Sequence, residues 1–473
     1  MVDGKVLAAR FAGAADFETR KVLCGGQLLT VLFLDGLTSG GDIAEQVVRP
    51  LAQMTDEARE EVLYTRALQG GVWCASVKEP ESTQQAAELL VNGFCVILFP
   101  KSGKALGCEV KTGEKRSPSP PETENTVKGA KDAFTETLRT NTSLVRRHLR
   151  TPGLRLTETV IGKRTLTKVT VCWIDRLTDP ELPRRMQERL SSIDIDGALS
   201  PAAIEEYVTG SRRTAFPLLE YTERTDHFCQ GLLDGQVGLL TDGLPLGYLA
   251  PVGLGRLMRS PEDRATDFFS ASMLRLLRYA ALGVSLLLPA LYAAMAMFHQ
   301  QMLPTKLLLS IIESKQNVPF STLLEVLGLL CAFELLQQAG LHLPQAVGTA
   351  VSIIGGLVVG TAAVDAKLVS PAALIVTASS GICGFTLPNR ELSDAVRLWR
   401  FVLTVLAGLW GLFGVTVGLL LLLTELAGLE SLGRSYLSPF GRAEVKGALV
   451  RPRLVRQKWR DGALKPMDDQ NQR

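Results

Sequence analysis

The sequence predicts an α/β soluble N-terminal region of two similar subdomains, followed by an all-α polytopic membrane domain of four to five spans. Composition is the first observation: 46% of the 473 residues are hydrophobic, yet 21% are charged, which fits a chain whose polar and apolar parts are segregated. Placement is the second, because residues 1–270 carry most of the charge and residues 273–430 hold long apolar runs. The third is that strand-like and helix-like runs follow one another twice in the same order within the polar half.

Residues 1–115 are expected to form the first α/β subdomain. LLTVLFLD (28–35) is a leucine-rich and β-branched run of strand length, and the amphipathic IAEQVVRPL (43–51) follows it. NGFCVILFP (92–100) is a second strong strand candidate. The turn-like residues after it predict a hairpin with ALGCEV (105–110).

The second α/β subdomain, residues 134–255, repeats this order after a linker. Residues 116–133 are rich in Pro, Ser and charge, so we expect an exposed linker there. KVTVCWID (168–175) resembles LLTVLFLD, and GLLDGQVGLLTDGLPLGYLAPV (231–252) resembles LLVNGFCVILFPKSGKALGCEV (89–110). Both matches lie at nearly equal separations along the chain, which predicts an internal duplication.

Several classes of function find no support in the polar half. The net charge of +3 comes with no basic patch interleaved with aromatic residues, which argues against nucleic-acid binding. The eight cysteines form no CxxC pair, so neither a metal site nor a disulfide framework is expected. No phosphate-binding glycine loop, GxSxG or HExxH occurs, so we expect no enzyme and no cofactor. Glu220, Glu223 and Asp226 in YTERTD have no evident nucleophile or metal partner, and the half is interpreted as a sensing or assembly region.

The chain starts without the apolar segment of a cleavable signal peptide, so the first membrane helix is expected to serve as the targeting signal. An uncharged run covers residues 279–298, with Pro289 in its middle. Arginines crowd the segment before it, which places the N-terminal region on the cytoplasmic side of the membrane. These arginines are Arg256, Arg259, Arg264, Arg275 and Arg278.

Two segments with polar residues follow. Residues 299–316 are too polar and too short to span, and form either an external loop with a half-helix or a re-entrant piece. Residues 318–340 are long enough to cross but contain Glu325 and Glu334, which a helix places on opposite sides. Intramembrane acids normally face a partner or water. The alternative is a helix lying in the interface, with both acids reaching solvent.

A ridge of small residues is predicted in the next apolar segment. Residues 345–364 carry no charge, close to the roughly 20 residues that a bilayer requires. Four small residues recur at a spacing of four, which places them on one face where another helix can approach closely. They are Gly348, Ser352, Gly356 and Gly360. Asp365 then marks a short polar loop and is a further intramembrane polar candidate.

Residues 368–389 and 401–424 complete the predicted set of spans, and the basic C-terminal tail is assigned to residues 431–473. Gly411, Gly414 and Gly418 again indicate close helix contacts. Charge leaves the topology of the last span open. The arginines between 390 and 400 and those of the tail both favour the cytoplasmic side, although a single span separates them. A tail lying on the membrane surface would avoid this conflict.

A series of motifs resembles the A subunits of bacterial spore nutrient-germinant receptors, the GerA-type spore germination family. The series covers about the last three-quarters of the chain in the expected order. It runs FTETLRTNTSLVRRHLRTPGL, FPLLEYTERTD, LLDGQVGLLTDGLP, SPED, LLPALYAAMAMFHQQMLPTKLLLSI, VPFSTLLE, FELLQQAGLHLP, VSIIGGLVVGTAAVDAKLVSP and LSPF. The sequence departs from the family's usual residues at Thr225, Gln337, Gln338, His342, Thr361 and Lys367. The lost charges argue against a family-wide ion-pair role for these segments.

The resemblance implies a non-enzymatic, multi-pass subunit in the spore inner membrane. Family members work with a permease-like B subunit and a lipoprotein C subunit, sense small nutrients, and start ion release. The resemblance also implies a homo-oligomer in membrane lipid that contributes to an ion-conducting path. Three other interpretations remain: the A-like subunit of the dipicolinate-release machinery, a solute-transporter component, or a membrane-anchored scaffold. No inverted repeat that would favour a transporter is evident among the spans.

Overall fold

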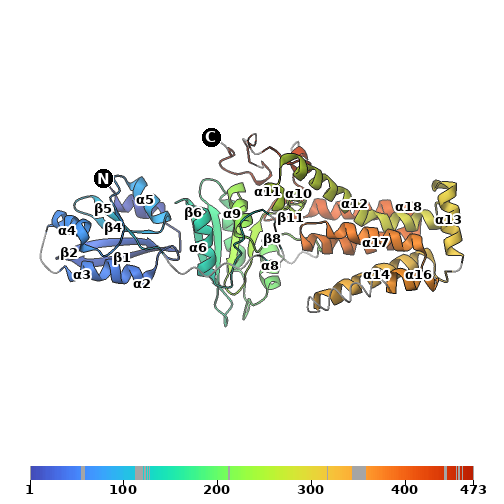
Figure 1. Ribbon diagram of the computed structural model, residues 1–473, viewed down its shortest axis with the longest axis horizontal. Helices are drawn as coiled ribbons and strands as arrows, with labels where there is room; N and C mark the ends of the chain where they lie inside the picture. Colours follow the sequence, from blue (N-terminus) through green and yellow to red (C-terminus); the bar gives the residue numbers. More distant parts are fainter. Residues whose placement is uncertain are drawn as a thin grey trace.

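The computed structural model describes most of the chain and shows two sheet-containing bodies followed by a bundle of helices along one long axis (Figure 1). The residues described are 2–54, 59–111, 121, 124, 126, 128–210, 214–316, 318–342, 358–440, 445–453, 455, 457, 459–460 and 462–471. The bodies follow one another in sequence order, and only the C-terminal segment returns toward the middle of the molecule.

The first body is a five-stranded antiparallel sheet covered by helices on both faces. Its strands are β1 (Phe17–Cys24), β2 (Gln27–Leu34), β3 (Val77–Lys78), β4 (Phe94–Phe99) and β5 (Lys104–Glu109), in the order β1-β2-β4-β5-β3. Its helices are α1 (Gly4–Arg10), α2 (Gly40–Asp42), η1 (Ile43–Val48), α3 (Arg49–Gln53), α4 (Glu60–Arg66), η2 (Ala67–Gly71) and α5 (Thr83–Val91). Successive side chains of β4 point alternately into two apolar clusters, so both faces of this strand are buried. This explains why its sequence, FCVILF, contains no charged or strongly polar residue.

The second body repeats this strand order. Its strands are β6 (Leu154–Ile161), β7 (Thr167–Ile174), β8 (Glu220–Thr222), β9 (Val237–Thr241) and β10 (Gly247–Ala250), in the order β6-β7-β9-β10-β8. Its helices are α6 (Leu138–His148), α7 (Glu181–Ser191), α8 (Pro201–Thr209) and α9 (Thr225–Asp234). Strand for strand, this is the order of the first sheet, which is the arrangement that a duplicated unit produces.

A buried ion pair joins the two bodies. Arg146 of α6 donates from Nε and Nη2 to the two carboxylate oxygens of Asp16, at 2.7 and 2.8 Å. The side chains are 1% and 2% exposed, respectively. Beside them the Ala15 N–H donates to the Leu156 carbonyl (2.8 Å), so residues next to β1 cover the edge strand β6.

Within the described residues of the membrane half, three helices are long and apolar enough to cross a bilayer. They are α12 (Phe268–Met297), α14 (Thr322–His342) and α18 (Arg390–Gly428). α17 (Pro371–Phe385) is apolar but shorter, so the predicted number of four to five spans stays a prediction. The remaining pieces are α10 (Leu254–Leu257), α11 (Glu262–Ala265), η3 (Gln300–Met302), α13 (Thr305–Lys315), η4 (Val358–Ala362) and α16 (Ala363–Asp365).

α18 reverses its direction at Gly411. The backbone there has φ +63° and ψ −142°, outside the helical region and open to glycine. A Cβ on Gly414 would overlap the carbonyl oxygen of Leu406, and one on Gly418 would overlap the side chain of Leu403. In a straight helix Leu403 and Gly418 would lie about 22 Å apart. The two parts of α18 therefore form an antiparallel hairpin whose helices touch through glycine.

This hairpin corrects the expectation of one uninterrupted span over residues 401–424. Both of its ends lie at the second α/β body, because Thr214 donates to Glu425 Oε1 (2.8 Å) and lines the same groove as Glu391. The basic residues that begin at Arg390 and the basic tail therefore lie on the same side. The charge conflict in the sequence disappears because the chain reverses at Gly411, between the two clusters.

The C-terminal segment packs against the second body instead of leaving the molecule. It contains β11 (Glu430–Ser431), β12 (Arg434–Ser435), α19 (Val445–Leu449) and η6 (Gly462–Leu464). Ser431 Oγ donates to the Leu218 carbonyl (2.6 Å) and accepts from the Val252 N–H (3.0 Å). Farther on, the Met467 N–H donates to the Leu177 carbonyl (2.8 Å). The tail is thus part of the fold around the second sheet.

Candidate functional site

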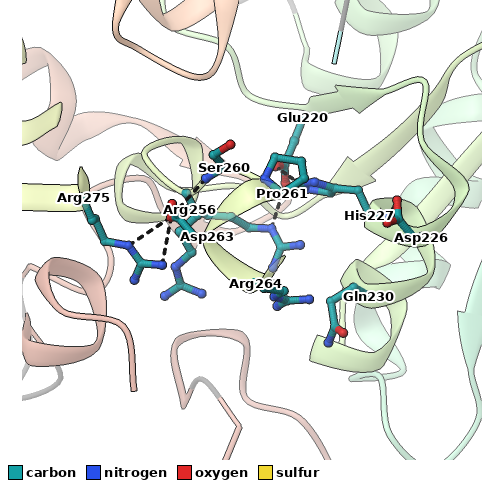
Figure 2. A pocket seen from close by; sticks show the side chains of 11 residues that line it. Glu220, Asp226, His227, Gln230, Arg256, Ser260, Pro261, Asp263, Arg264 and Arg275 are labelled. Atoms are coloured by element: carbon teal, nitrogen blue, oxygen red, sulfur yellow. Dashed lines mark hydrogen bonds and ion pairs between the residues drawn. The ribbon is translucent and has the colours of Figure 1, made fainter. Parts of the chain in front are cut away.

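A charged cavity of about 180 Å³ lies where the second α/β body meets the first membrane helix (Figure 2). Its walls come from β8 and α9 of the α/β body and from the short segment that leads into α12. The lining residues are Glu220, Asp226, His227, Gln230, Arg256, Arg259, Ser260, Pro261, Asp263, Arg264 and Arg275. We call this cluster, together with Asp234 and Arg278, the junction cluster.

Asp263 ties the short helix α11 to α12. Its carboxylate is 2% exposed and contacts Arg275 (3.1 Å) and Arg278 (2.8 Å), both on the first turns of α12. Arg275 also donates from Nη1 to the Gly447 carbonyl of the tail (3.3 Å). One buried carboxylate therefore compensates two guanidinium groups at the entrance to the membrane.

Glu220 and Asp234 make a second group with Arg256. Arg256 donates to Glu220 (2.8 Å) and to Asp234 (3.0 Å), while His227 contacts the other oxygen of Glu220 (3.0 Å). Burial alone would raise the pKa of Glu220, but Arg256 and His227 outweigh it and hold that pKa at about 2. Asp234, which also pairs with Arg264 (3.1 Å), has a lowered pKa because the neighbouring arginines again outweigh its burial. Both carboxylates are therefore charged at neutral pH.

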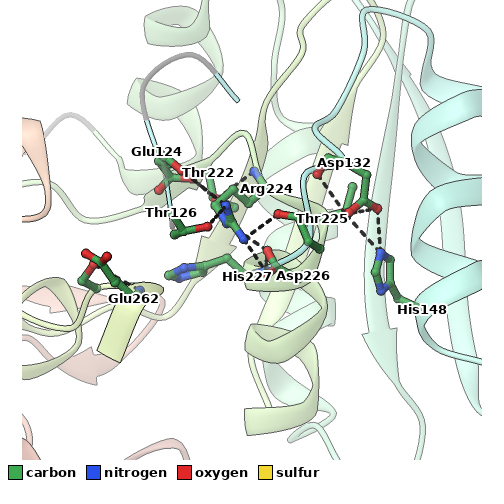
Figure 3. Close-up of polar contacts among 12 residues, drawn as sticks. Glu124, Thr126, Asp132, His148, Thr222, Arg224, Thr225, Asp226, His227 and Glu262 are labelled. Carbon is green, nitrogen blue, oxygen red and sulfur yellow. Dashed lines mark hydrogen bonds and ion pairs between the residues drawn. The ribbon is translucent and has the colours of Figure 1, made fainter. Parts of the chain in front are cut away.

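A third group fixes the stretch before α6 to the start of α9 (Figure 3). Arg224, which is buried, forms a bidentate pair with Asp226 (3.0 and 2.7 Å) and donates to the Ala130 carbonyl (2.9 Å). Next to it, Thr225 Oγ1 donates to Asp132 (2.6 Å), and Asp132 pairs with His148 (2.7 Å). The described part of the predicted linker is thus bound to the second body.

The junction cluster joins the second body to the segment that leads into α12. Glu220, Asp234 and Asp263 pair with arginines of this segment and of α12, whereas Asp226 pairs with Arg224 of the second body. His227 contacts Glu220. Among the described residues, no group of three His, Cys, Asp or Glu side chains has a geometry that could hold a metal ion. What the arrangement provides is a stiff polar link between the second sheet and α12.

The sequence also predicted functional residues in the membrane half, and they do not lie together in one site. Gly348, Ser352 and Gly356 lie outside the described residues. Gly360 belongs to η4, with open space around its Cα, and Asp365 is exposed at the end of α16.

Glu325 and Glu334 lie at different depths in the bundle. The Glu325 side chain is fully buried, accepts from the Ser370 N–H at the start of α17, and lies 3.4 Å from Lys315. Glu334 is 29% exposed and pairs with Arg397 of α18 (2.8 Å). Each acid therefore has a partner from another helix.

Sequence reasoning noticed most members of the junction cluster without bringing them together. Glu220 and Asp226 stood out in YTERTD, Asp263 falls in SPED, and the arginines were interpreted only as a topology signal. The missing information was that β8 and α9 face the segment before α12. A usable signal was present, because acids interrupt an arginine-rich segment directly before an apolar run.

Comparisons with known proteins identify the family. The profile of the Bacillus/Clostridium GerA spore germination protein matches residues 5–466. The chain belongs to the GerA family. Spore germination protein KA of Bacillus subtilis (strain 168) is 34% identical over 448 residues, covering 93% of this chain and 81% of its own length. Spore germination protein GerLA of Bacillus cereus is 32% identical over 433 residues, covering 91% and 88%.

Two further similarities complete the comparison for this GerA-family chain. The membrane protein YfkQ of Bacillus subtilis (strain 168) is 36% identical over 439 residues, covering 92% of this chain and 84% of that protein. The crystal structure of the N-terminal domain of the A subunit of the Bacillus megaterium spore germinant receptor GerK3 is 23% identical. It aligns with a TM-score of 0.41, covering 52% of this chain and 92% of that chain.

The pair of His148 and Asp132 is expected to make the stability of the second body pH-dependent. Asp132 raises the pKa of His148 in the folded state. The protonated pair therefore stabilises the folded state fully below the unfolded pKa of His148, about 6.5, and this stabilisation is lost as the pH rises through the higher pKa of the folded state. The pair is partly exposed, so we expect about 1 kcal/mol or less. Unfolding midpoints between pH 6 and 8 should fall in the parent and change less in His148→Gln. A parallel decline in both proteins would contradict this assignment.

Proposed function

We propose that this chain is the A subunit of a spore nutrient-germinant receptor in the spore inner membrane, with its α/β bodies in the cytoplasm. It would work with a permease-like B subunit and a lipoprotein C subunit, form a homo-oligomer, and contribute to an ion-conducting path. Membership of the GerA family and the similarity to named spore germination proteins support this role. Three long apolar helices in the described part of the chain support a membrane location.

The observation that carries the proposal is the junction cluster. A receptor subunit must convert an event in one part into movement in another, and this needs a stiff connection between them. Asp263 with Arg275 and Arg278, and Arg256 with Glu220, connect the second sheet to α12 through buried ion pairs. We propose that this connection transmits the nutrient signal between the soluble bodies and the membrane bundle.

A deletion of the gene in its spore-forming host tests the role. Dormant spores without the chain are expected to lose monovalent-ion release in response to at least one class of amino acid, sugar or nucleoside. Reintroducing the parent gene should restore that release. Spores that sense every nutrient normally but retain dipicolinate would assign the chain to the release machinery instead. Labelled-solute uptake by the purified protein alone would favour a transporter.

Conduction and assembly need separate measurements. Liposomes containing the purified chain with its B and C partners are expected to pass cations, whereas a scaffold would leave them tight. We also propose that the ridge from Gly348 to Gly360 is a helix contact, so Gly356→Leu should prevent co-purification of the subunits while membrane insertion continues. Normal co-purification of this variant would refute the ridge contact and leave the receptor role open.

A further inference from the structure

Two arginines lie one turn apart on α18, and only one of them pairs with the two neighbouring acids. Arg397 contacts both Asp394 and Glu334. Arg400 lies one turn farther along the same helix and is 1% exposed. Its Nη1 donates to Ser380 Oγ (3.2 Å), while its Nε has no acceptor among the residues that the structure describes. A buried guanidinium without a carboxylate is a costly arrangement in the membrane half of a protein.

Glu334 is the candidate carboxylate for Arg400. Glu334 uses one oxygen on Arg397, and its Oε2 has no hydrogen-bond donor among the described residues. Glu334 is also close enough to Arg400 to interact with it electrostatically. Residues 343–357, which follow α14, contain no Asp or Glu, so this stretch offers no alternative acid.

Moving Glu334 to Arg400 requires a defined shift of α14. A Cβ on Gly408 would meet Leu323, and Glu334 meets Arg397, so α14 and the first part of α18 run antiparallel. Arg400 lies three residues beyond Arg397 toward the end of the bundle remote from the α/β bodies. At 1.5 Å per residue this corresponds to a slide of about 4.5 Å.

The packing of α14 suits such a slide. Its apolar window is 22% buried inside the protein, against 39% for α12 and for α18. It is held by the apolar packing of Val326, Leu329 and Leu330 and by its two acids. Glu325 accepts from the Ser370 N–H near one end, and Glu334 pairs with Arg397 nearer the other. A slide would break both contacts together, and this makes the two positions discrete rather than continuous.

We propose that α14 has two positions on α18, with Glu334 bound to Arg397 in one and to Arg400 in the other. In the first position Arg400 has no acid among the residues that the structure describes. In the second Arg397 keeps Asp394, so each arginine then has one carboxylate. The exchange provides a two-state element inside the membrane bundle.

A cycle of variants in the full-length, detergent-solubilised protein tests the exchange. Glu334→Gln is introduced into the parent, Arg397→Gln, Arg400→Gln and the variant with both arginines changed. If Glu334 has two partners, Glu334→Gln still lowers the thermal unfolding midpoint by several degrees in Arg397→Gln. The effect should vanish only when both arginines are changed. Arg390→Gln, an exposed arginine on the same helix, is the matched control and should leave the midpoint unchanged.

Other outcomes decide against the proposal. If Glu334→Gln has no further effect in Arg397→Gln, Glu334 belongs to Arg397 alone. If Arg397→Gln fails to fold, Arg400 does not take over, and if Arg400→Gln fails to fold, Arg400 is a structural residue in the present position. In spores, Arg397→Gln and Arg400→Gln should shift the nutrient concentration for half-maximal response in opposite directions. That last readout depends on the proposed receptor function, whereas the unfolding cycle does not.

Discussion

Asp263→Asn is expected to destabilise the connection between the second α/β body and α12 by about 3–5 kcal/mol. Asparagine has the shape of aspartate but no charge, so Arg275 and Arg278 would remain buried without their shared carboxylate. We expect a lower unfolding midpoint in detergent and loss of nutrient-triggered ion release. Limited proteolysis should cut the segment between Arg256 and Phe268 faster than in the parent.

The neighbouring acid provides the control for this prediction. Glu262 lies beside Asp263 in α11 and has a partly exposed side chain, so Glu262→Gln should change the unfolding midpoint little. Removing one arginine together with the acid, as in Asp263→Asn with Arg278→Gln, should recover part of the stability, because fewer uncompensated charges remain. If Asp263→Asn behaves like Glu262→Gln, the ion pairs are not what connects the two halves.

Gly414→Val is expected to open the α18 hairpin. A side chain at this position would overlap the Leu406 carbonyl. A backbone atom of a packed helix cannot move aside without shifting the helix. Overpacking alone costs about 1–3 kcal/mol, and separating the two helices would add the loss of their apolar contacts. We expect poor yield of monodisperse protein and loss of the Thr214–Glu425 contact at the other end of the hairpin.

A matched glycine separates this effect from helix propensity. Gly283 lies within α12, and a Cβ there would meet no atom within 4 Å. Gly283→Val should therefore be tolerated, since valine costs less than glycine in a helix. Equal tolerance of Gly414→Val would show that the chain does not fold back at Gly411.

The N-terminal α/β half was the part that sequence reasoning predicted best. LLTVLFLD and KVTVCWID became β2 and β7, and NGFCVILFP and ALGCEV formed the expected hairpin of β4 with β5. These strands can be predicted because each is a continuous apolar run with a turn beside it, and this pattern is local in the sequence. The buried pair of Asp16 and Arg146 was not predictable, since it joins residues from two separate bodies.

In the membrane half, local sequence patterns predicted less of the fold. The reversal at Gly411 lies inside an apolar run with helix-forming residues on both sides, and one φ value decides it. Gly411, Gly414 and Gly418 were recognised as close contacts. Gly414 and Gly418 touch the other part of α18, whereas Gly411 lies against Phe298 and His299, which follow α12. The conflict between the two basic clusters was the one signal that the chain reverses between them.

The return of the C-terminal segment to the second sheet has a consequence for biosynthesis. Ser431 binds the Leu218 carbonyl across 213 residues of sequence, and the five strands of that sheet all precede the membrane half. At 5–20 residues per second, the ribosome needs roughly 10–40 s to make the intervening chain. During that interval the second body lacks the strap formed by β11 and β12, and its apolar surface around Leu432 stays open to water. A nascent chain stalled before residue 430 should therefore recruit chaperones more strongly than one released at its end.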